Sequence, residues 1–373
     1  MKNTNSELST TDVNAGRSGV ADVSNIWGMS PLERQRKQFL KLSISPSANL
    51  VLRPDVIYDD AVLIGLAKSA DVVLLDEDAT PLAAHVSDNQ LLSAERWLFD
   101  GADIPASARS VTPAEAGGDY NRKLRKRAAA KCYVIRDDNA REIEWQLYLA
   151  SYKGVTDLVT KYIWPHPAYH VTRFCARHRI SPNMVTSASA VLTLLSFWLF
   201  WEGQFSWGLL SGWLMTFLDT VDGKLARVTL TASEWGNIFD HGIDLIHPPF
   251  WYLAWGFGLL SAGQISSEWL HACIWAVFAG YIGGRLIEGY FIRRHGFHIH
   301  VWRRFDSFFR LIVARRNPNL ILLTLSYLGD RPELGFFAVV AWTLISVPVH
   351  LTQSIDAEIA RARGKQLTSW LSN

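Results

Sequence analysis

The sequence has few cysteines and lacks the features of several common protein classes. Cys132, Cys175 and Cys273 stand far apart and form no CxxC pair, so neither a disulfide framework nor a zinc site is expected from them. The formal net charge is only +2, which gives the chain no strong attraction to nucleic acid. The first thirty residues lack the apolar core of a signal peptide, and no internal repeat is evident.

Apolar residues are abundant but unevenly distributed. Hydrophobic residues make up 49% of the chain and charged residues 19%, with 16 tryptophans and 18 phenylalanines. Nearly all of the acidic and polar sequence lies before residue 160, and apolar runs separated by basic residues follow it. This division predicts a soluble N-terminal part, the front of the chain, and a membrane-embedded C-terminal part, its back.

The front of the chain is typical of a polar tail followed by a small soluble α/β domain. Residues 1–45 are expected to be disordered because they are rich in Ser, Thr and Asn. Residues 46–140 alternate strand-like and helix-like patterns. The expected strands are NLVLRP, ADVVLLDED and KCYVIRD, and the expected helices are DDAVLIGLAKSA and NQLLSAERWLF. The basic segment GGDYNRKLRKRAAAK is interpreted as a solvated helix.

The back of the chain predicts an α-helical integral membrane protein. Residues 141–180 mix aromatic and basic side chains, which suits juxtamembrane helices at the headgroup level. Residues 181–356 then form a six-helix domain with six transmembrane helices. The expected spans are 185–202, 205–222, 236–260, 267–291, 317–330 and 333–354.

Basic residues alternate with the apolar stretches in a way that predicts orientation. Lys224 and Arg227 lie between the second and third stretches, and residues 292–316 carry seven arginines against one acid, Asp306. The opposite links, EGQ, SAGQISSE and GDRPELG, contain one arginine in total. Because positive loops remain in the cytoplasm, we expect a multi-pass inner-membrane protein. Both termini, including the tail 357–373, and the acids described next would face the cytoplasm.

Four aspartates interrupt the second and third apolar stretches. On a helix, Asp219 and Asp222 lie on one face with Gly223, and Asp240 and Asp244 lie on one face of the next helix. Four anions at a cleft inside a bilayer require a counter-ion. Oxygen ligands indicate Mg²⁺ or Mn²⁺ rather than zinc, and two such ions would suit phosphoryl transfer.

The stretch DTVDGKLARVTLTASEWGNIFDHGID resembles the signature of the CDP-alcohol phosphotransferases, D-x2-D-G-x2-A-R-x8-G-x3-D-x3-D, without a departure. The resemblance covers residues 180–355, and SPNMVT upstream is similar to the family's entry to the first span. It implies attack of an alcohol on the phosphate distal to cytidine with release of CMP, and a homodimer. It also implies the following roles: metal binding by Asp219, Asp222, Asp240 and Asp244; general base catalysis by Asp244; CDP binding by Gly223, Arg227, Ser233, Asn183 and Thr186.

The basic loop after the fourth stretch allows two interpretations. Its arginines can reflect positive-inside topology and attraction to anionic lipid, or they can bind a phosphorylated polyol acceptor. The candidates for acceptor binding are Arg285, Arg303, Arg304, Arg310, Arg315 and Arg316. His295, His298 and His300 do not by themselves indicate a metal, because interfacial histidines are common.

The sequence favours a membrane enzyme of phospholipid biosynthesis with CDP-diacylglycerol as its donor, because acyl chains would lie beside the cleft. The alternative donor is a soluble one such as CDP-inositol. It is suggested by a weak resemblance of the front domain to sugar-phosphate nucleotidyltransferases, whose glycine-rich loop is missing here. A cation transporter using the four acids, or a catalytically inactive membrane scaffold, are hypotheses from other classes. No inverted halves support the transporter.

Overall fold

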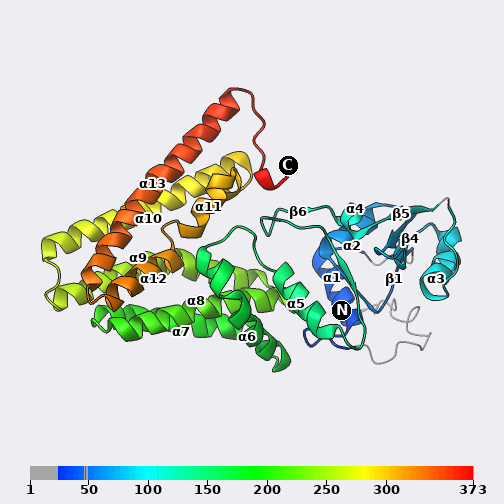
Figure 1. Cartoon of the computed structure of the whole chain (residues 1–373), viewed down its shortest axis with the longest axis horizontal. Helices are drawn as coiled ribbons and strands as arrows, with labels where there is room; N and C mark the ends of the chain where they lie inside the picture. The colour runs from blue at the N-terminus through cyan, green and yellow to red at the C-terminus, as the bar shows by residue number, and fades with distance from the viewer. Residues whose placement is uncertain (1–23, 46, 48, 107, 373) are drawn as a thin grey trace, which may run out of the picture. The chain divides into compact units, whose positions relative to one another are not determined.

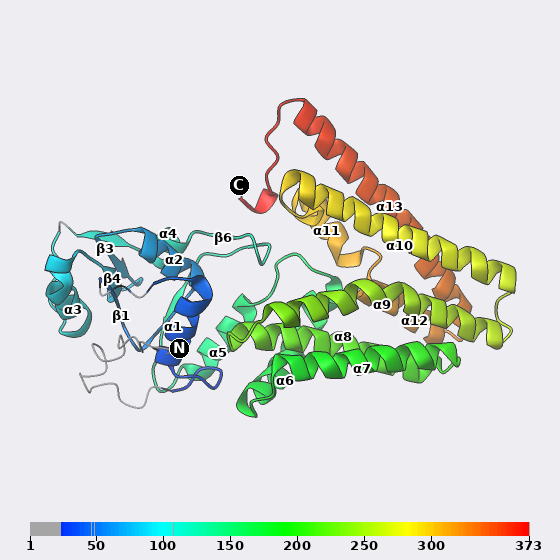
Figure 2. The same ribbon diagram turned by 180° about the vertical axis from the view of Figure 1, so that it is seen from behind.

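A computed structural model describes residues 24–45, 47, 49–106 and 108–372 of the chain. The chain forms two compact units (Figures 1 and 2). Unit 1 comprises Met1–Tyr120 and Ala128–Leu147, and unit 2 comprises Asn121–Arg127 and Tyr148–Asn373. Helix α5 (Ala140–Ala150), which the sequence placed with the juxtamembrane helices, belongs mostly to unit 1 and ends in unit 2.

Unit 1 contains short strands and helices. The four-stranded sheet has the order β1-β4-β3-β5, with β1 and β3 antiparallel to β4 and β5 parallel to β3, while β2 pairs with β8. The strands that the sequence predicted correspond to β1, β3 and β8, and the two helices to α2 and α3. The elements are α1 (Pro31–Leu42), β1 (Leu50–Leu52), β2 (Val56–Tyr58), α2 (Asp60–Lys68), β3 (Val72–Leu75), β4 (Pro81–His85), η1 (Asp88–Gln90), α3 (Leu91–Phe99), β5 (Arg109–Val111), α4 (Pro113–Gly117), β8 (Cys132–Val134) and α5 (Ala140–Ala150).

The sheet buries side chains on both faces. Val72 and Leu74 pack with Leu63 of α2 on one face. Val73, between them, packs with Trp97 of α3 on the other face. Successive side chains of a strand point to opposite faces, so the apolar run VVLL supplies two cores at once.

The prediction of disorder for residues 1–45 is wrong over Pro31–Leu42, where α1 forms. Ser30 caps the helix, and a proline occupies its first position. The helix packs through polar side chains: Gln35 Nε2 donates to Val56 O at 3.1 Å and Gln38 Nε2 to Tyr58 O at 3.0 Å. A polar composition therefore concealed a helix whose amides satisfy strand carbonyls. Residues 1–23 lie outside the described residues.

The prediction of a helix for residues 117–131 is also wrong. The segment forms a two-stranded hairpin of β6 (Tyr120–Asn121) and β7 (Lys126–Arg127). Gly118, with a φ of 73°, ends α4 in a conformation that glycine adopts readily. Asn121 Oδ1 accepts from Leu124 N at 2.9 Å and so holds the turn.

Unit 2 is helical. Helices α7, α8 and α9 lie side by side, and α13 packs against α10 and α12 (Figures 1 and 2). Trp251 and Trp255 of α9 pack with Phe200 of α7 and Phe336 of α13 in the central core. The elements are η2 (Val159–Ile163), α6 (Pro165–Arg177), α7 (Pro182–Trp201), α8 (Phe205–Val228), α9 (Glu234–Ser261), α10 (Ser267–His295), η3 (Ile299–Val301), α11 (Arg304–Ile312), α12 (Arg316–Leu328), α13 (Pro332–Ala362) and η4 (Trp370–Ser372).

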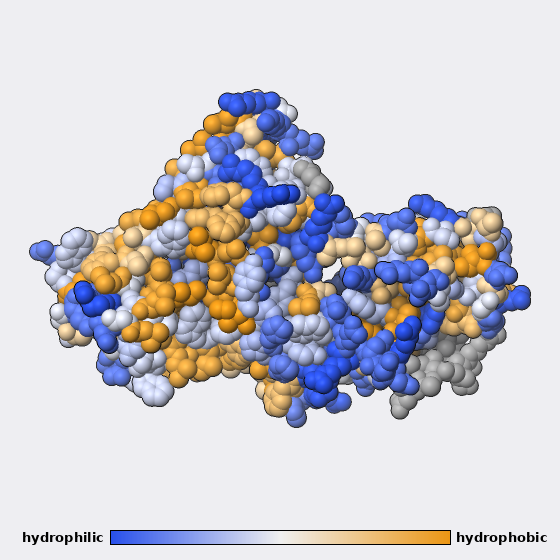
Figure 3. Space-filling model, in the orientation of Figure 1, coloured by the Kyte–Doolittle hydropathy of each residue, from blue (hydrophilic) through white to orange (hydrophobic). Residues whose placement is uncertain are grey.

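Each of the six predicted spans coincides with a helix, namely α7, α8, α9, α10, α12 and α13. Among the described helices, three are long and apolar enough to cross a membrane: α7, α10 and α13. Apolar residues cover much of the face of the unit 2 helices that Figure 3 shows. On α7, for example, Val191, Leu194 and Trp198 are exposed. Such outward apolar side chains suggest a membrane protein. The count of six spans remains a prediction.

Candidate active site

The four aspartates converge from two neighbouring helices. Helix α8 carries Asp219 and Asp222 one turn apart, and α9 carries Asp240 and Asp244 one turn apart. Carboxylate oxygens of Asp219, Asp240 and Asp244 lie within 4.8 Å of one another. Because oxygens at this separation repel each other when ionised, the arrangement favours a bound cation. The helical spacing read from the sequence therefore places these acids at one site.

Asp222 is the most buried of the four acids, at 3% exposed. Its Oδ2 accepts from Thr186 Oγ1 of α7 at 2.6 Å. Its Oδ1 is buried and has no hydrogen-bond partner among the described residues. A buried carboxylate oxygen is costly unless a positive charge or a donor faces it. This oxygen therefore fits a metal ion at the site, and Thr186, which we expected at the nucleotide, is tied to the acid.

The acids differ in exposure. The Asp219 side chain is 17% exposed, Asp240 30% and Asp244 43%. Asp244 is therefore the carboxylate that a molecule arriving from outside meets first. This position suits a base that takes a proton from an incoming group.

Arg316, at the start of α12, bridges the two acid-bearing helices. Its Nη2 donates to Asp219 Oδ2 at 2.6 Å, and its Nη1 donates to Asp244 Oδ1. The sequence suggested Arg316 as one of six acceptor-binding arginines. The structure places it within the acidic cluster, where it supplies a fixed positive charge.

Gly223 and Gly236 leave room for side chains beside the acids. A Cβ at Gly223 would lie 3.1 Å from Arg227 Nη2, so the guanidinium rests against the α8 backbone. A Cβ at Gly236 would lie 2.9 Å from Asn183 Oδ1 and 3.0 Å from Ser233 Oγ. Asn183 and Ser233 thus meet at the start of α9, where Ser233 caps the helix through Gly236 N at 3.0 Å.

Lys153 is a cation near the site that the sequence did not single out, since we took it for an interfacial residue. Burial lowers the pKa of Lys153 to about 8, and the charges of Arg125, Arg227 and Arg310 add to this effect, while Asp240 opposes it. The Lys153 amine therefore lies within electrostatic range of Asp240 and of these three arginines. The mixed aromatic and basic composition around residue 153 gave no signal for this placement.

The structure separates the remaining candidate arginines. Arg285 Nη1 and Arg315 Nη2 contact Glu288 Oε2 at 3.1 and 2.6 Å. Arg303 pairs with Asp306 at 3.2 Å. The guanidinium of Arg304, an exposed residue, lies 5.5 Å from the Trp370 ring.

Arg310 is 8% exposed, and its Nε and Nη1 are buried without a hydrogen-bond partner in the described part of the chain. Burial, followed by the charge of Arg315, lowers the pKa of Arg310 well below its usual value. A buried guanidinium of this kind has the capacity to bind an anion. Arg310, Arg315 and Arg285 are therefore the better-placed candidates for a phosphorylated ligand, and Arg304 is the least enclosed.

Comparison with known proteins places the acids in a family. The sequence model described as CDP-alcohol phosphatidyltransferase matches residues 179–344, which include all four aspartates. A comparison with curated proteins returned no match. Residues 179–344 therefore belong to the CDP-alcohol phosphatidyltransferase family, a family of phosphotransferase enzymes.

Proposed function

We propose that the protein transfers a substituted phosphate from a CDP-alcohol to the hydroxyl group of an acceptor, with release of CMP, at the surface of a membrane. The observation that carries this proposal is the convergence of Asp219, Asp240 and Asp244, with the buried Asp222 one turn from Asp219. The family generally depends on divalent metal ions and uses CDP-alcohol donors and hydroxyl acceptors.

The metal would be Mg²⁺ or Mn²⁺, held as two ions by Asp219, Asp222, Asp240 and Asp244. An all-oxygen donor set suits these hard cations, and the buried Asp222 Oδ1 supports the assignment. When bound, the ions neutralise the diphosphate and stabilise the charge that develops on the leaving oxygen.

The cytidine diphosphate would lie where α7, α8 and α9 meet. Arg227, which Gly223 allows to rest against α8, supplies a fixed charge for a phosphate. Asn183 and Ser233 supply polar groups beside it, and Thr186 acts through its hydrogen bond to Asp222. Lys153 adds a second cation on the same side.

Asp244 would act as the general base on the acceptor hydroxyl. It is the most exposed of the four carboxylates, and Arg316 orients it through one hydrogen bond. An ionised carboxylate at this position can accept the hydroxyl proton as the oxygen attacks the phosphate distal to cytidine. Arg316 keeps its positive charge during this step and continues to offset the negative charge of the acids.

A lipid donor is favoured by the apolar side chains that flank Asp240 and Asp244 on α9. Ile238, Phe239, Leu245 and Ile246 are each about half exposed or more. Acyl chains lying on this apolar surface would bring a diphosphate headgroup to the acids. CDP-diacylglycerol is therefore our first choice, in phospholipid biosynthesis, and CDP-inositol is the soluble alternative.

The acceptor would be a hydroxyl compound or a phosphorylated polyol. Arg285, Arg310 and Arg315 are the arginines best placed to bind its phosphate. We further propose an inner-membrane location with the active site and both termini in the cytoplasm, because the basic loops gather on one side of the sequence-predicted topology. We expect a homodimer, as the family resemblance implies.

The test is CMP release by the purified protein with Mg²⁺ and a panel of CDP-alcohols. Vesicles loaded with an ion-sensitive dye measure metal flux in parallel. Asp244→Asn removes the base and is expected to reduce CMP release by at least about 100-fold, the lower end of the usual contribution of acid–base catalysis. No CMP from any donor, or undiminished CMP from the variant, would contradict the proposal, and metal flux without CMP would favour a transporter.

A further inference from the structure

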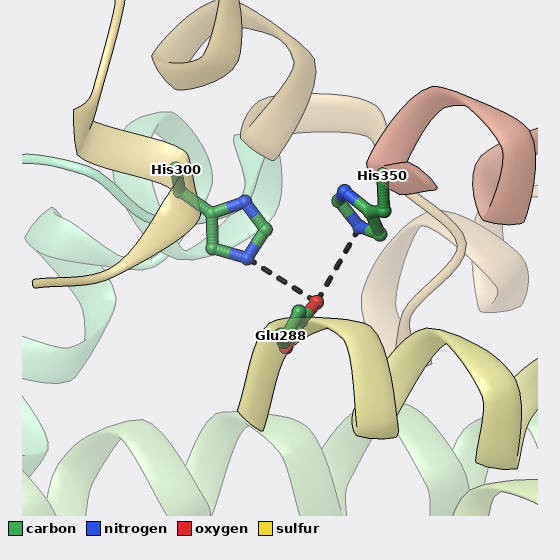
Figure 4. A group of neighbouring side chains, drawn as sticks. All are labelled: Glu288, His300 and His350. Carbon is green, nitrogen blue, oxygen red and sulfur yellow. Dashed lines mark ion pairs between the residues drawn. The ribbon is translucent and has the colours of Figure 1, made fainter. Parts of the chain in front are cut away.

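A second group of ligand-type side chains lies in unit 2, apart from the four aspartates. Glu288 of α10, His300 of η3 and His350 of α13 meet there, and both imidazole rings point at the carboxylate (Figure 4). His300 Nε2 lies 3.3 Å and His350 Nε2 3.4 Å from the same oxygen, Glu288 Oε1. His300 is 1% exposed and His350 2% exposed.

A neighbouring hydrogen-bond chain fixes the tautomer of His350. Gln353 Nε2 donates to Asp306 Oδ1 at 3.0 Å, so the amide oxygen of Gln353 faces His350 Nδ1 at 2.9 Å. The amide oxygen can only accept, and Nδ1 therefore carries the proton. Burial favours the neutral ring, which leaves a lone pair on His350 Nε2.

That lone pair faces another acceptor. Over the residues that the structure describes, His350 Nε2 and Glu288 Oε1 have no hydrogen-bond partner. Two acceptor atoms that face each other in a buried place repel unless a positive charge lies between them. The arrangement is that of ligands around a cation.

The distances of 3.3 and 3.4 Å from the two imidazole nitrogens to Glu288 Oε1 fit a transition metal. A tetrahedral ion with bonds of about 2.0–2.1 Å to nitrogen and oxygen separates its ligand atoms by about 3.3–3.4 Å. We propose that Glu288 Oε1, His300 Nε2 and His350 Nε2 bind a transition-metal ion of the Zn²⁺ class, with the fourth position open. Gln353 and Asp306 orient His350 from outside the site, as such partners do in metal centres.

The site differs from the aspartate cluster in the atoms that would bind the metal. Two imidazole nitrogens and one carboxylate favour zinc-like ions, whereas oxygen-only sites favour Mg²⁺ or Mn²⁺. Arg285 and Arg315 hold the other oxygen, Glu288 Oε2. Arg315 Nη2 also donates to His300 Nε2 at 3.3 Å, so this nitrogen presents its lone pair, and a bound ion has to displace the guanidinium from it. These charges limit the affinity for a cation and favour an anion such as hydroxide or phosphate in the fourth position. The proposal does not depend on the phosphotransferase reaction.

The experiment measures zinc bound by the full-length purified protein. The protein is stripped with a chelator, equilibrated with Zn²⁺ in excess Mg²⁺, and assayed by atomic emission. We expect one zinc per chain in the wild type and an affinity at least about 100-fold weaker in His300→Ala and His350→Ala. Gln353→Leu, which removes the orienting amide, is expected to weaken binding about 10- to 100-fold.

His298→Ala is the matched control, because His298 is exposed and lies two residues from His300. His298→Ala and Asp240→Asn are both expected to bind zinc as the wild type does. A loss of zinc therefore reports on the site at Glu288, whereas a loss of CMP release in Asp240→Asn reports on the aspartate cluster. If His300→Ala or His350→Ala does not fold, Co²⁺ titration of the wild type replaces the comparison, and a tetrahedral visible spectrum is expected. A wild type that retains no zinc, variants that retain as much as the wild type, or Co²⁺ without that spectrum would overturn the proposal.

Discussion

Arg316 offers a test of the charge balance at the aspartate cluster. The substitution Arg316→Met keeps much of the apolar stem and removes the guanidinium that bonds to Asp219 and Asp244. A divalent ion and this guanidinium are both positive and share the same two carboxylates. We therefore expect the variant to bind Mn²⁺ more tightly than the wild type does.

The size of the effect follows from the hydrogen bonds that the ion has to compete with. A hydrogen bond to a charged group contributes about 1.5–3 kcal/mol. If metal binding replaces only one such bond at the lower limit, the affinity of the variant rises about tenfold, since 1.4 kcal/mol corresponds to a factor of about ten. CMP release should fall in the same variant, because Arg316 also orients the proposed base.

Mn²⁺ binding is measured by electron paramagnetic resonance on the purified protein, and CMP release on the same preparation. Arg293→Met is the control, because Arg293 is an exposed arginine at the end of α10. Affinity and activity that move in opposite directions would not result from a general folding defect. An unchanged or weaker Mn²⁺ affinity in Arg316→Met would refute the competition between the arginine and the metal.

Three further predictions address the donor side of the site. Asp222→Asn should lower CMP release at least about 100-fold, because loss of a ligand exceeds the 10- to 100-fold effect of an outer partner. Activity above about a hundredth of wild type in the CMP assay would contradict this role. Gly236→Ala places a methyl 2.9 Å from Asn183 Oδ1. At about 1–3 kcal/mol for such overlap, the substitution should raise the donor KM about fivefold or more. Gly242→Ala on the same helix, with open space around it, should have no effect, and equal KM values for the two variants would argue against the close contact. The pKa of Lys153 is lowered to about 8, so kcat/KM for the donor should fall as the pH rises through about 8, where the amine loses its charge. In Lys153→Arg, whose guanidinium stays charged, kcat/KM should not change over this pH range. A fall that persists in this variant would assign the titration to another group.

Much of the helical architecture and the core of the candidate site could be predicted from the sequence. The apolar runs locate α7 to α10, α12 and α13, because burial in lipid or in a core demands continuous apolar surface. The spacing of Asp219, Asp222, Asp240 and Asp244 assigns each pair to one face, because the helical repeat is fixed by local backbone geometry. Unit 1 was less predictable, since α1 is held by buried glutamines and the basic hairpin by a local turn.

The sequence by itself determined which carboxylates share a helix face, because neighbours in a helix are neighbours in the chain. The tertiary structure decided which distant groups meet those carboxylates. Arg316 stands 97 residues from Asp219 and 72 from Asp244, and His350 reaches Glu288 from a different helix. Such contacts depend on how helices pack against one another, and side-chain periodicity carries no information about that packing.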